Sequence, residues 1–424
     1  MHRILLALVL TGAALAAAPP DALARTGSCL VPGVDAVCSV WTGKVTFVGD
    51  GDTIYVNVKG EGRRHVRITG INAMEQSVYS RFAARRRGDC HALEATARLE
   101  ELIERGKGRV RLAAQDPASR SGRRVRRSVG VRIKGRWRDV GRRLLAEGHA
   151  LWLPNNVEHV WNHDYSVLAQ RAARLGRGMW SPEACGAGPG AAGQVRVWAN
   201  WDADGADKDN LNGEWIRVQN LDPAAELPLG GWWVRDSDLR RYTFPSWVTL
   251  PPGETVTVYV GDGPDTWTEL FWGLRRPVFD NASDGVRAKG DGAYLFDPEG
   301  DLRAHMMYPC RYECSDPNMG AIQIGAKWKG REHITLRNVA GHAIDLGAYR
   351  LSSPPYSYAF TRDAVLLPGE EMRVEIEGDP ARDTRLEKHW GETGPILNNT
   401  GDRVRLSSYT DIRIGCFSYG DGVC

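Results

Sequence analysis

The residue types that could carry out chemistry gather in two short segments near the start of the chain. Residues 50–53 read Asp-Gly-Asp-Thr, and residues 66–75 contain Arg67, Asn72 and Glu75. Carboxylate and amide oxygens are the ligands that hard cations such as Ca²⁺ prefer. The planar guanidinium of arginine matches two phosphate oxygens at once. This combination of residue types suits chemistry on a phosphate ester.

The surrounding sequence predicts a small β-barrel with helices, which would hold these residues in place. Apolar and polar residues alternate over 53–58 and 64–71, as in strands with one buried face. Further strands are expected at 39–48, 109–112 and 125–133, and helices at 90–105, 140–147 and 165–175. Five strands plus helices are typical of the Greek-key barrel called the OB-fold.

The net charge of +3 hides a strong asymmetry along the chain. Residues 39–186 hold 28 Lys and Arg against 15 Asp and Glu, a net +13, whereas residues 187–424 hold 25 against 35, a net −10. Nucleic acid is the usual partner of such a basic domain. A solvated basic surface is an equal alternative on charge alone. Residues 186–193 contain only Gly, Ala and Pro and form the expected linker.

An ordered set of motifs across residues 39–185 resembles the thermonuclease, or staphylococcal nuclease-like, family. The set consists of Asp-Gly-Asp-Thr at 50–53, the arginine and glutamate within 66–75, Ser-Gly-Arg at 121–123, Pro-Asn-Asn at 154–156 and Gly-Met-Trp-Ser at 178–181. The resemblance implies an OB-fold domain that hydrolyses the phosphodiester bonds of nucleic acid. It also implies little sequence preference and products that end in a 3′-phosphate.

The resemblance implies a Ca²⁺ site formed by Asp52, Asn72 and the carbonyl of Ala73. The family has an acidic residue where this chain has Asn72, so the site loses one negative charge. Because ligand charge tunes affinity, we expect weaker Ca²⁺ binding or a preference for another divalent metal. The simpler alternative for Asp52 is that it caps a hairpin turn.

The resemblance assigns the reaction itself to Glu75, Arg67 and Arg123. Glu75 would orient or deprotonate the attacking water, and the two arginines would bind the phosphate. Arg123 lies in an arginine-rich run, so Arg120 or Arg124 is an alternative for its role, and both are candidates for nucleic-acid binding. The simpler alternatives are a surface carboxylate at Glu75 and a structural ion pair at Arg67.

Trp152 lies close to a position where the family has a tyrosine, and it is a candidate for stacking on a base. The tyrosine that precedes Gly-Arg in the family is Ser121 here, which removes one contact near the nucleotide. Burial of Trp152 in the core is an equal alternative.

Residues 194–424 contain an internal repeat with a period of about 117 residues. Leu-Gly-Gly-Trp at 229–232 corresponds to Leu-Gly-Ala-Tyr at 346–349, and Leu-Pro-Pro-Gly-Glu at 250–254 corresponds to Leu-Leu-Pro-Gly-Glu at 366–370. Each copy has short alternating segments between Pro and Gly turns. This pattern is typical of an Ig-like β-sandwich.

Both copies, at 194–309 and 325–418, resemble the lamin-tail domain. The resemblance implies modules for interaction with an envelope or a protein partner, without catalytic residues. The acidic run at 202–210 looks like a Ca²⁺-binding loop but lacks the glutamate of a complete EF-hand. We therefore expect a solvated acidic loop there.

The first 24 residues have the pattern of a secretory signal peptide. A basic start, an apolar run at 4–18 and small residues before the junction predict cleavage after Ala24. The apolar run is shorter than the roughly 20 residues that a spanning helix needs. No later segment is apolar enough to span a bilayer, so we expect a secreted, extracellular protein without a transmembrane segment.

Eight cysteines fit an oxidising compartment, and their scattered spacing argues against a zinc site. We expect disulfides between Cys29 and Cys38, between Cys90 and Cys185, and locally among the last four cysteines.

These patterns predict a mainly β multidomain protein, an OB-fold barrel followed by two Ig-like β-sandwiches. The leading hypothesis for its function is a secreted, Ca²⁺-dependent nuclease that acts on DNA, with RNA as a further candidate substrate. The alternative is a catalytically inactive extracellular nucleic-acid-binding protein on the same fold, which Asn72 favours. A surface adhesin built on the sandwiches is a third interpretation, but it leaves the barrel motifs unexplained.

Overall fold

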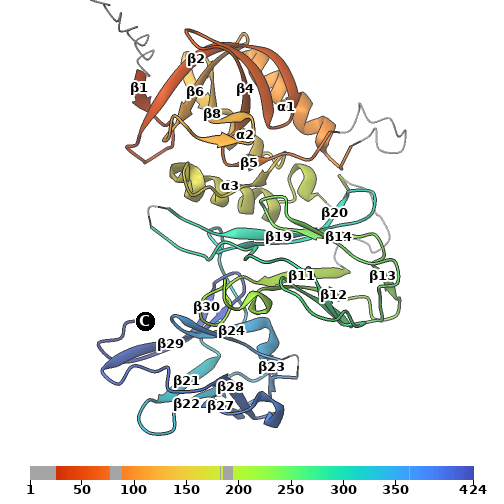
Figure 1. Ribbon diagram of the computed structural model, residues 1–424, viewed down its shortest axis with the longest axis vertical. Coiled ribbons are helices and arrows are strands. Elements are labelled where there is room, and N and C mark those ends of the chain that lie inside the picture. Colours follow the sequence, from red (N-terminus) through yellow and green to blue (C-terminus); the bar gives the residue numbers. More distant parts are fainter. Residues whose placement is uncertain (1–24, 77–87, 182, 185–193, 286, 362) are drawn as a thin grey trace, which may run out of the picture.

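The computed structural model describes residues 25–76, 88–181, 183–184, 194–285, 287–361 and 363–424. Figure 1 shows a barrel domain at one end, a first sandwich in the middle and a second sandwich at the other end. The mainly β multidomain fold is therefore confirmed. The predicted signal peptide (1–24) and linker (186–193) lie outside the described residues.

The barrel closes because the first and last strands in its strand order pair with each other. Its strand order is β2-β3-β4-β8-β6, and β6 pairs back onto β2; only β4 and β8 run parallel among these pairs. The five strands are β2 (Val37–Asp50), β3 (Thr53–Val58), β4 (Gly62–Ile68), β6 (Arg109–Ala114) and β8 (Arg124–Ile133). The shorter strands of this domain are β1 (Arg25–Ser28), β5 (Ile71–Asn72), β7 (Arg120–Ser121), β9 (Arg136–Asp139) and β10 (Leu151–Trp152).

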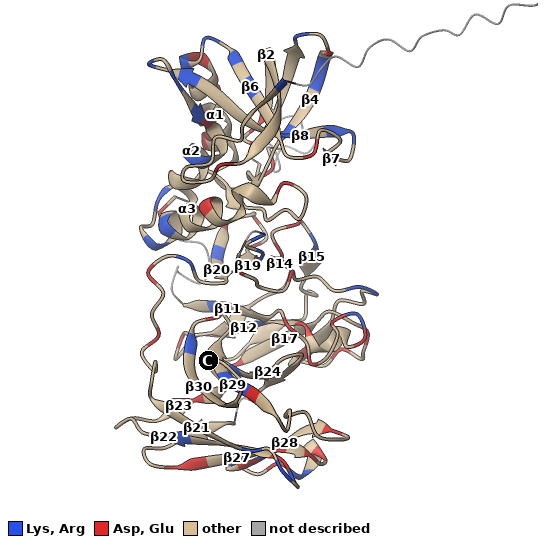
Figure 2. Ribbon diagram, turned by 90° about the vertical axis from the view of Figure 1, so that its left-hand side faces the viewer, with Lys and Arg blue, Asp and Glu red and all other residues tan. Residues whose placement is uncertain are grey.

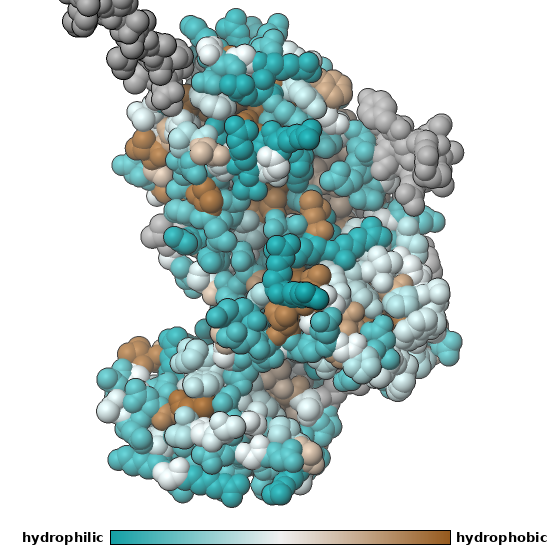
Figure 3. All heavy atoms as spheres, in the orientation of Figure 1, coloured by the Kyte–Doolittle hydropathy of each residue, from teal (hydrophilic) through white to brown (hydrophobic). Residues whose placement is uncertain are grey.

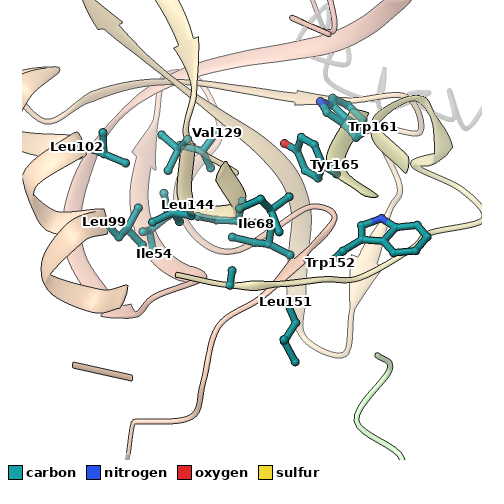
Figure 4. Close-up of a cluster of buried hydrophobic side chains, with 14 of the residues drawn as sticks. Ile54, Ile68, Leu99, Leu102, Val129, Leu144, Leu151, Trp152, Trp161 and Tyr165 are labelled. Atoms are coloured by element: carbon teal, nitrogen blue, oxygen red, sulfur yellow. The ribbon is translucent and has the colours of Figure 1, made fainter. Parts of the chain in front are cut away.

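Alternating side chains decide which face of each barrel strand is buried. In β3, Ile54 and Val56 are fully buried, whereas Tyr55 is half-buried and Asn57 is exposed. The helices are α1 (Ala92–Arg105), α2 (Val140–Ala146) and α3 (Asn162–Arg174), close to their predicted positions. Figure 4 shows Leu99 and Leu102 of α1 in one buried cluster with Ile54. The strands and helices therefore share a single apolar core.

The two sandwiches repeat the same topology. Their sheets have the orders β11-β12-β17-β18 with β15-β14-β19-β20, and β21-β22-β27-β28 with β25-β24-β29-β30. In the first, the strands are β11 (Val195–Asn200), β12 (Trp215–Asn220), β13 (Leu227–Pro228), β14 (Trp233–Arg235), β15 (Arg241–Thr243), β16 (Thr249–Leu250), β17 (Thr255–Tyr259), β18 (Glu269–Phe271), β19 (Asp291–Phe296) and β20 (Leu302–Tyr308). In the second, they are β21 (Ile322–Lys327), β22 (His333–Asn338), β23 (Ile344–Asp345), β24 (Tyr349–Ser353), β25 (Tyr356–Ala359), β26 (Val365–Leu366), β27 (Glu371–Glu377), β28 (Glu387–Glu392), β29 (Gly401–Ser408) and β30 (Arg413–Gly420). Short 3₁₀ turns are η2 (His159–Trp161), η3 (Gly178–Trp180), η4 (Leu211–Gly213), η5 (Leu346–Ala348) and η6 (Pro380–Arg382).

Equivalent buried polar side chains support the repeat at the level of single residues. Asn220 donates to the Leu250 carbonyl at 3.1 Å, and Asn338 donates to the Leu366 carbonyl at 3.0 Å. Both asparagines are almost completely buried. Because a buried amide must find partners, the same residue at the same point of both copies holds the same loop in place.

The barrel and the first sandwich bury one continuous core. Trp233, Tyr294, Phe296 and Met307 of the first sandwich belong to the apolar cluster of the barrel domain. The rings of Trp233 and Phe296 stack with their centroids 4.0 Å apart. Burial of large aromatic side chains at a domain boundary stabilises one fixed arrangement.

Hydrogen bonds from the acidic loop at 202–210 reach the second sandwich. Asp202 pairs with Arg350 at 3.0 Å, and Asp204 accepts hydrogen bonds from the Ser357 amide at 2.8 Å and from Trp390 at 3.0 Å. The expectation of a solvated loop was wrong for these two aspartates, because they connect the sandwiches. Figure 3 shows a mainly hydrophilic surface with a notch beside the second sandwich.

Three disulfides are present among the described residues: Cys29–Cys38, Cys310–Cys314 and Cys416–Cys424. They confirm the first predicted bridge and the local bridges among the last four cysteines. Cys185, the predicted partner of Cys90, lies outside the described residues. Within the described part of the chain, no helix is both long and apolar enough to cross a membrane.

We predict that the stability of the first sandwich depends on the protonation of Glu214. This side chain is fully buried and accepts a hydrogen bond from the Val278 amide at 2.8 Å. Burial raises the pKa of Glu214 from 4.5 to about 8, so its contribution to stability is complete below pH 4.5 and is lost as the pH rises through about 8. Glu214→Gln removes this dependence. Urea unfolding at pH 5, 7 and 9 measures the effect. From pH 5 to pH 9, the free energy of unfolding of the variant should rise by roughly 2–4 kcal/mol relative to that of the wild type.

The matched control is Glu226→Gln, at an exposed position of the same sandwich. We expect its free energy of unfolding to stay within about 0.5 kcal/mol of the wild type at every pH. A Glu214→Gln variant that follows the wild type across the pH range would contradict the prediction.

Candidate functional site

A tight turn between β2 and β3 places Asp52 at the edge of the barrel. The amide of Asp52 donates to the Asp50 carboxylate at 3.1 Å, which closes the turn. A Cβ at Gly51 would lie 2.7 Å from the Cβ of Ala73 and 2.8 Å from that of Ala95. The turn can approach its neighbours this closely only because residue 51 is glycine.

Asp52 and Arg67 form an ion pair at the centre of the site. Thr53 and Arg67 are register partners on β3 and β4, and the Arg67 guanidinium lies 2.7 Å from the Asp52 carboxylate. Only 4% of the Arg67 side chain and 2% of the Asp52 side chain are exposed. Asp52 also accepts hydrogen bonds from the Ala73 amide at 2.9 Å and from the Thr53 hydroxyl at 2.8 Å. Burial raises the pKa of Asp52 to about 7, although the Arg67 charge opposes this rise.

Glu75 lies at the open side of the same cluster. Glu75 is exposed to solvent, but neighbouring protein atoms remove part of the hydration of its carboxyl group. This partial burial raises the pKa of Glu75. The charge of Asp50 raises this pKa further, whereas the charges of Arg67 and Arg124 lower it. Glu75 therefore lies within electrostatic range of both arginines, and it is open to solvent.

Arg124, and not Arg123, is the arginine beside the Asp52 turn. Its guanidinium donates to the Thr53 hydroxyl at 3.1 Å. Arg123 and Arg120 instead line a separate surface pocket together with Arg63. The alternative in which Arg124 takes the role assigned to Arg123 is therefore the one that the geometry supports.

Trp152 is completely buried, and Figure 4 places it among the core side chains of the barrel domain. A fully buried indole cannot stack on a nucleotide base. The structure thus favours the core alternative, and the prediction that Trp152 stacks on a base of the nucleic acid is wrong.

An aromatic and basic row on the outer face of β3 and β4 was missed by the sequence analysis. The rings of Tyr55 and His65 stack 4.2 Å apart, and the Arg63 guanidinium lies 4.9 Å from the Tyr55 centroid. Phe47 of β2, which is 48% exposed, lies beside Tyr55 with ring centroids 5.9 Å apart. The alternation of β3 predicts that Tyr55 points outward, but only the strand register shows that His65 lies opposite.

A second side chain that the sequence did not reveal is Arg235, which reaches the site from β14 of the first sandwich. The Asn72 side-chain amide is oriented so that both of its polar atoms have hydrogen-bond partners. Its nitrogen donates to the Ala73 carbonyl at 2.9 Å, and its oxygen accepts from Arg235 at 3.2 Å. Arg235 is 4% exposed, and Asn72 is 1% exposed. The site therefore contains residues of both domains.

The domain that supplies Arg235 matches a known protein family. Residues 191–309 match the family model described as Lamin Tail Domain. The lamin-tail prediction for the first sandwich is therefore confirmed, and the second sandwich shares its strand order. No curated protein matches the chain. The resemblance of residues 39–185 to thermonucleases stays a prediction.

The donor atoms of the predicted Ca²⁺ site do not fit a hard cation in this arrangement. The oxygens of Asp52 face Arg67, Thr53 and the Ala73 amide. The Asn72 oxygen faces Arg235 of the lamin-tail domain, and the Ala73 carbonyl faces the Asn72 amide. The described residues contain no group of three or more His, Cys, Asp or Glu side chains that could hold a metal. A calcium ion at this place stays a prediction.

We predict that Arg67→Met destabilises the protein by about 3 kcal/mol at pH 8, because it leaves the buried Asp52 carboxylate without its counter-charge. Urea unfolding measures the loss. Asp52→Asn in the same chain should recover part of it, since the neutral amide needs no counter-charge.

The control is Arg64→Met, which removes a pair with Glu61 from a side chain that is 39% exposed. Exposed pairs contribute about 0–1 kcal/mol, so this variant should remain near the wild type. Equal decreases in the free energy of unfolding of Arg67→Met and Arg64→Met would show that the buried pair contributes no more to stability than the exposed pair.

Proposed function

We propose that the barrel domain hydrolyses phosphodiester bonds of nucleic acid. The observation that carries the proposal is the grouping of Glu75 and Arg124 around the buried Asp52–Arg67 pair, at the end of a basic outer face. Figure 2 shows Lys and Arg on β4, β6 and around β7 of the barrel domain. A polyanionic substrate is attracted to such a face, and an acid–arginine cluster supplies what hydrolysis of a phosphate ester requires.

Glu75 would act as the base that orients or deprotonates the attacking water. Water can reach the exposed Glu75 carboxylate, and the raised pKa of this group lies closer to neutral pH. A base with a pKa nearer the working pH transfers protons more effectively.

The two arginines would act from different depths. Arg124 is only partly buried and can contact a phosphate while it remains bound to Thr53. Arg67 lies beneath the surface, where Asp52 fixes its orientation and its charge acts at short range. Fixed positive charge near a phosphate stabilises the negative charge of the transition state.

The row of Phe47, Tyr55, His65 and Arg63 supports a path for one nucleic-acid strand towards this cluster. Aromatic side chains stack on any base, so the binding they provide is tolerant of sequence. The row and the cluster share β3 and β4. The register pair Tyr55 and His65 lies two residues along these strands from the register pair Thr53 and Arg67.

The same reasoning extends to the rest of the chain. We propose that the protein is secreted, and that the sandwiches position the barrel domain on an envelope or a protein partner. The lamin-tail match supports an interaction module in this place.

A second candidate function is nucleic-acid binding without catalysis. The observation that favours it is the contact of Asn72 with Arg235, which occupies an oxygen that the predicted metal would use. Both candidates require the basic face, but only hydrolysis requires Glu75.

We predict that Glu75→Gln lowers the rate of nucleic-acid cleavage by about 100-fold or more, which is the contribution expected of a general base. The assay follows single-stranded DNA, plasmid DNA and RNA with Ca²⁺, with Mn²⁺ and with a chelator. Fluorescence anisotropy should find the DNA affinity of the variant within about threefold of the wild type.

Glu61→Gln is the matched control, because Glu61 pairs with Arg64 away from the cluster; it should cleave at the wild-type rate. Unchanged cleavage by Glu75→Gln would sink the proposed role of Glu75. Salt-sensitive binding without cleavage in any metal would leave the second candidate function.

A further inference from the structure

The contact between Asn72 and Arg235 joins a predicted metal ligand to a cation from another domain. Asn72 accepts from the Arg235 guanidinium at 3.2 Å, and its own amide donates to the Ala73 carbonyl at 2.9 Å. Both neutral oxygens that the Ca²⁺ prediction requires therefore have hydrogen-bond donors: Arg235 donates to the Asn72 oxygen, and the Asn72 amide donates to the Ala73 carbonyl.

Arg235 is fixed in this position from its own side of the boundary. Its guanidinium donates to the Asp236 carbonyl at 2.8 Å and to the Ser237 carbonyl at 3.0 Å. Carbonyl acceptors on a single turn leave the side chain little freedom. Burial lowers the pKa of Arg235, and the charges of Asp236, Asp89 and Glu75 oppose this change. A positive charge therefore stands permanently among the acidic groups of the barrel site.

The boundary that carries Arg235 is extensive. The large apolar side chains of β14, β19 and β20 share the core of the barrel domain. On either side of this core, the Cys90 amide donates to the Gly300 carbonyl at 3.1 Å, and Gln170 donates to the Pro309 carbonyl at 2.8 Å. Withdrawal of Arg235 would require separation of this interface, so the charge stays in place while the domains are docked.

We propose that Arg235 of the lamin-tail domain takes the place of a divalent cation in the barrel site, so that the site works without a bound metal. A cation at Asp52 and Asn72 would meet a guanidinium already bound to Asn72. Like charges that share a buried site repel strongly, because little water screens them. Arg235 is a positioning residue: it holds Asn72 and supplies charge from beneath the surface.

The proposal makes Asn72 and Arg235 a matched pair. An aspartate at position 72 would restore the acidic ligand, but Arg235 would neutralise it by forming an ion pair. Removal of Arg235 alone would leave a neutral amide at position 72, so that Asp52 would be the only charged ligand of the predicted set. Only the simultaneous change of both residues should create a metal site.

The test is a double-mutant cycle with Asn72→Asp, Arg235→Met and the combination, each in the complete protein. Isothermal titration with Ca²⁺ and with Mn²⁺ measures binding at a single site. We expect no stoichiometric binding by the wild type, and at least tenfold tighter binding by the double variant than by either single variant. Asp52→Asn should abolish the site created in the double variant.

The charge control is Arg241→Met, the register partner of Arg235 on β15, whose side chain is exposed. Combined with Asn72→Asp, it removes the same charge from the same sheet and should not create the site. Equal Ca²⁺ binding by Asn72→Asp alone and by the double variant would overturn the proposal.

If Arg235→Met fails to fold, the wild-type protein still decides the question. Stoichiometric Ca²⁺ or Mn²⁺ binding that Asp52→Asn abolishes would show that Arg235 does not exclude the metal. The consequence for activity rests on the proposed function, whereas the titration does not involve cleavage. A positive cycle in a protein that cleaves nothing would therefore overturn only the proposed hydrolysis.

Discussion

The organisation of this site depends on one buried ion pair. A carboxylate and a guanidinium that are almost inaccessible to water meet at 2.7 Å, between a turn after β2 and the end of β4. Both charges lose hydration on burial, and each is tolerated only while the other remains beside it. Arg67 is thus held in one orientation, the Ala73 amide is bound to Asp52, and the segment that leads to Glu75 leaves the barrel in a fixed direction.

This constraint also explains why the first sandwich cannot be regarded as an appendage. The Ala73 segment is held on one side by Asp52 and on the other by Asn72, and Asn72 is itself held by Arg235. Apolar side chains of the lamin-tail domain complete the core of the barrel domain at the same boundary. The interface and the site are therefore two parts of one structure. We infer that a barrel separated from the lamin-tail domain would have a different charge distribution around Glu75.

Sequence patterns were sufficient where the relevant contacts are local or follow strand periodicity. They predicted the strands of the barrel and its three helices. The family resemblance placed Asp52 and Arg67 in one site, and the pairing of β3 with β4 brings these two residues together. Patterns were insufficient where burial depends on distant elements. Trp152 looked equally suited to stacking and to the core, and the structure decides for the core, because β10 packs against α3 and the indole is fully buried.

Arg235 shows the limit most clearly. It lies 163 residues after Asn72 in a domain with a different fold, in a short strand that has no recognisable binding motif. The choice between Arg123 and Arg124 was also open, because both follow the same glycine and the turn between β7 and β8 decides which one faces Thr53. In each case the deciding information is a register or a domain boundary, which single-sequence patterns do not encode.

The most direct test is a crystal structure of the protein with a short single-stranded oligonucleotide that carries cleavage-resistant phosphorothioate linkages. We expect a phosphorothioate in contact with Arg124 and close to Glu75, with bases against Tyr55 or His65. We also expect Arg235 to remain bound to Asn72. An oligonucleotide bound elsewhere on the chain, with no phosphate near Glu75 and Arg124, would contradict the proposed site.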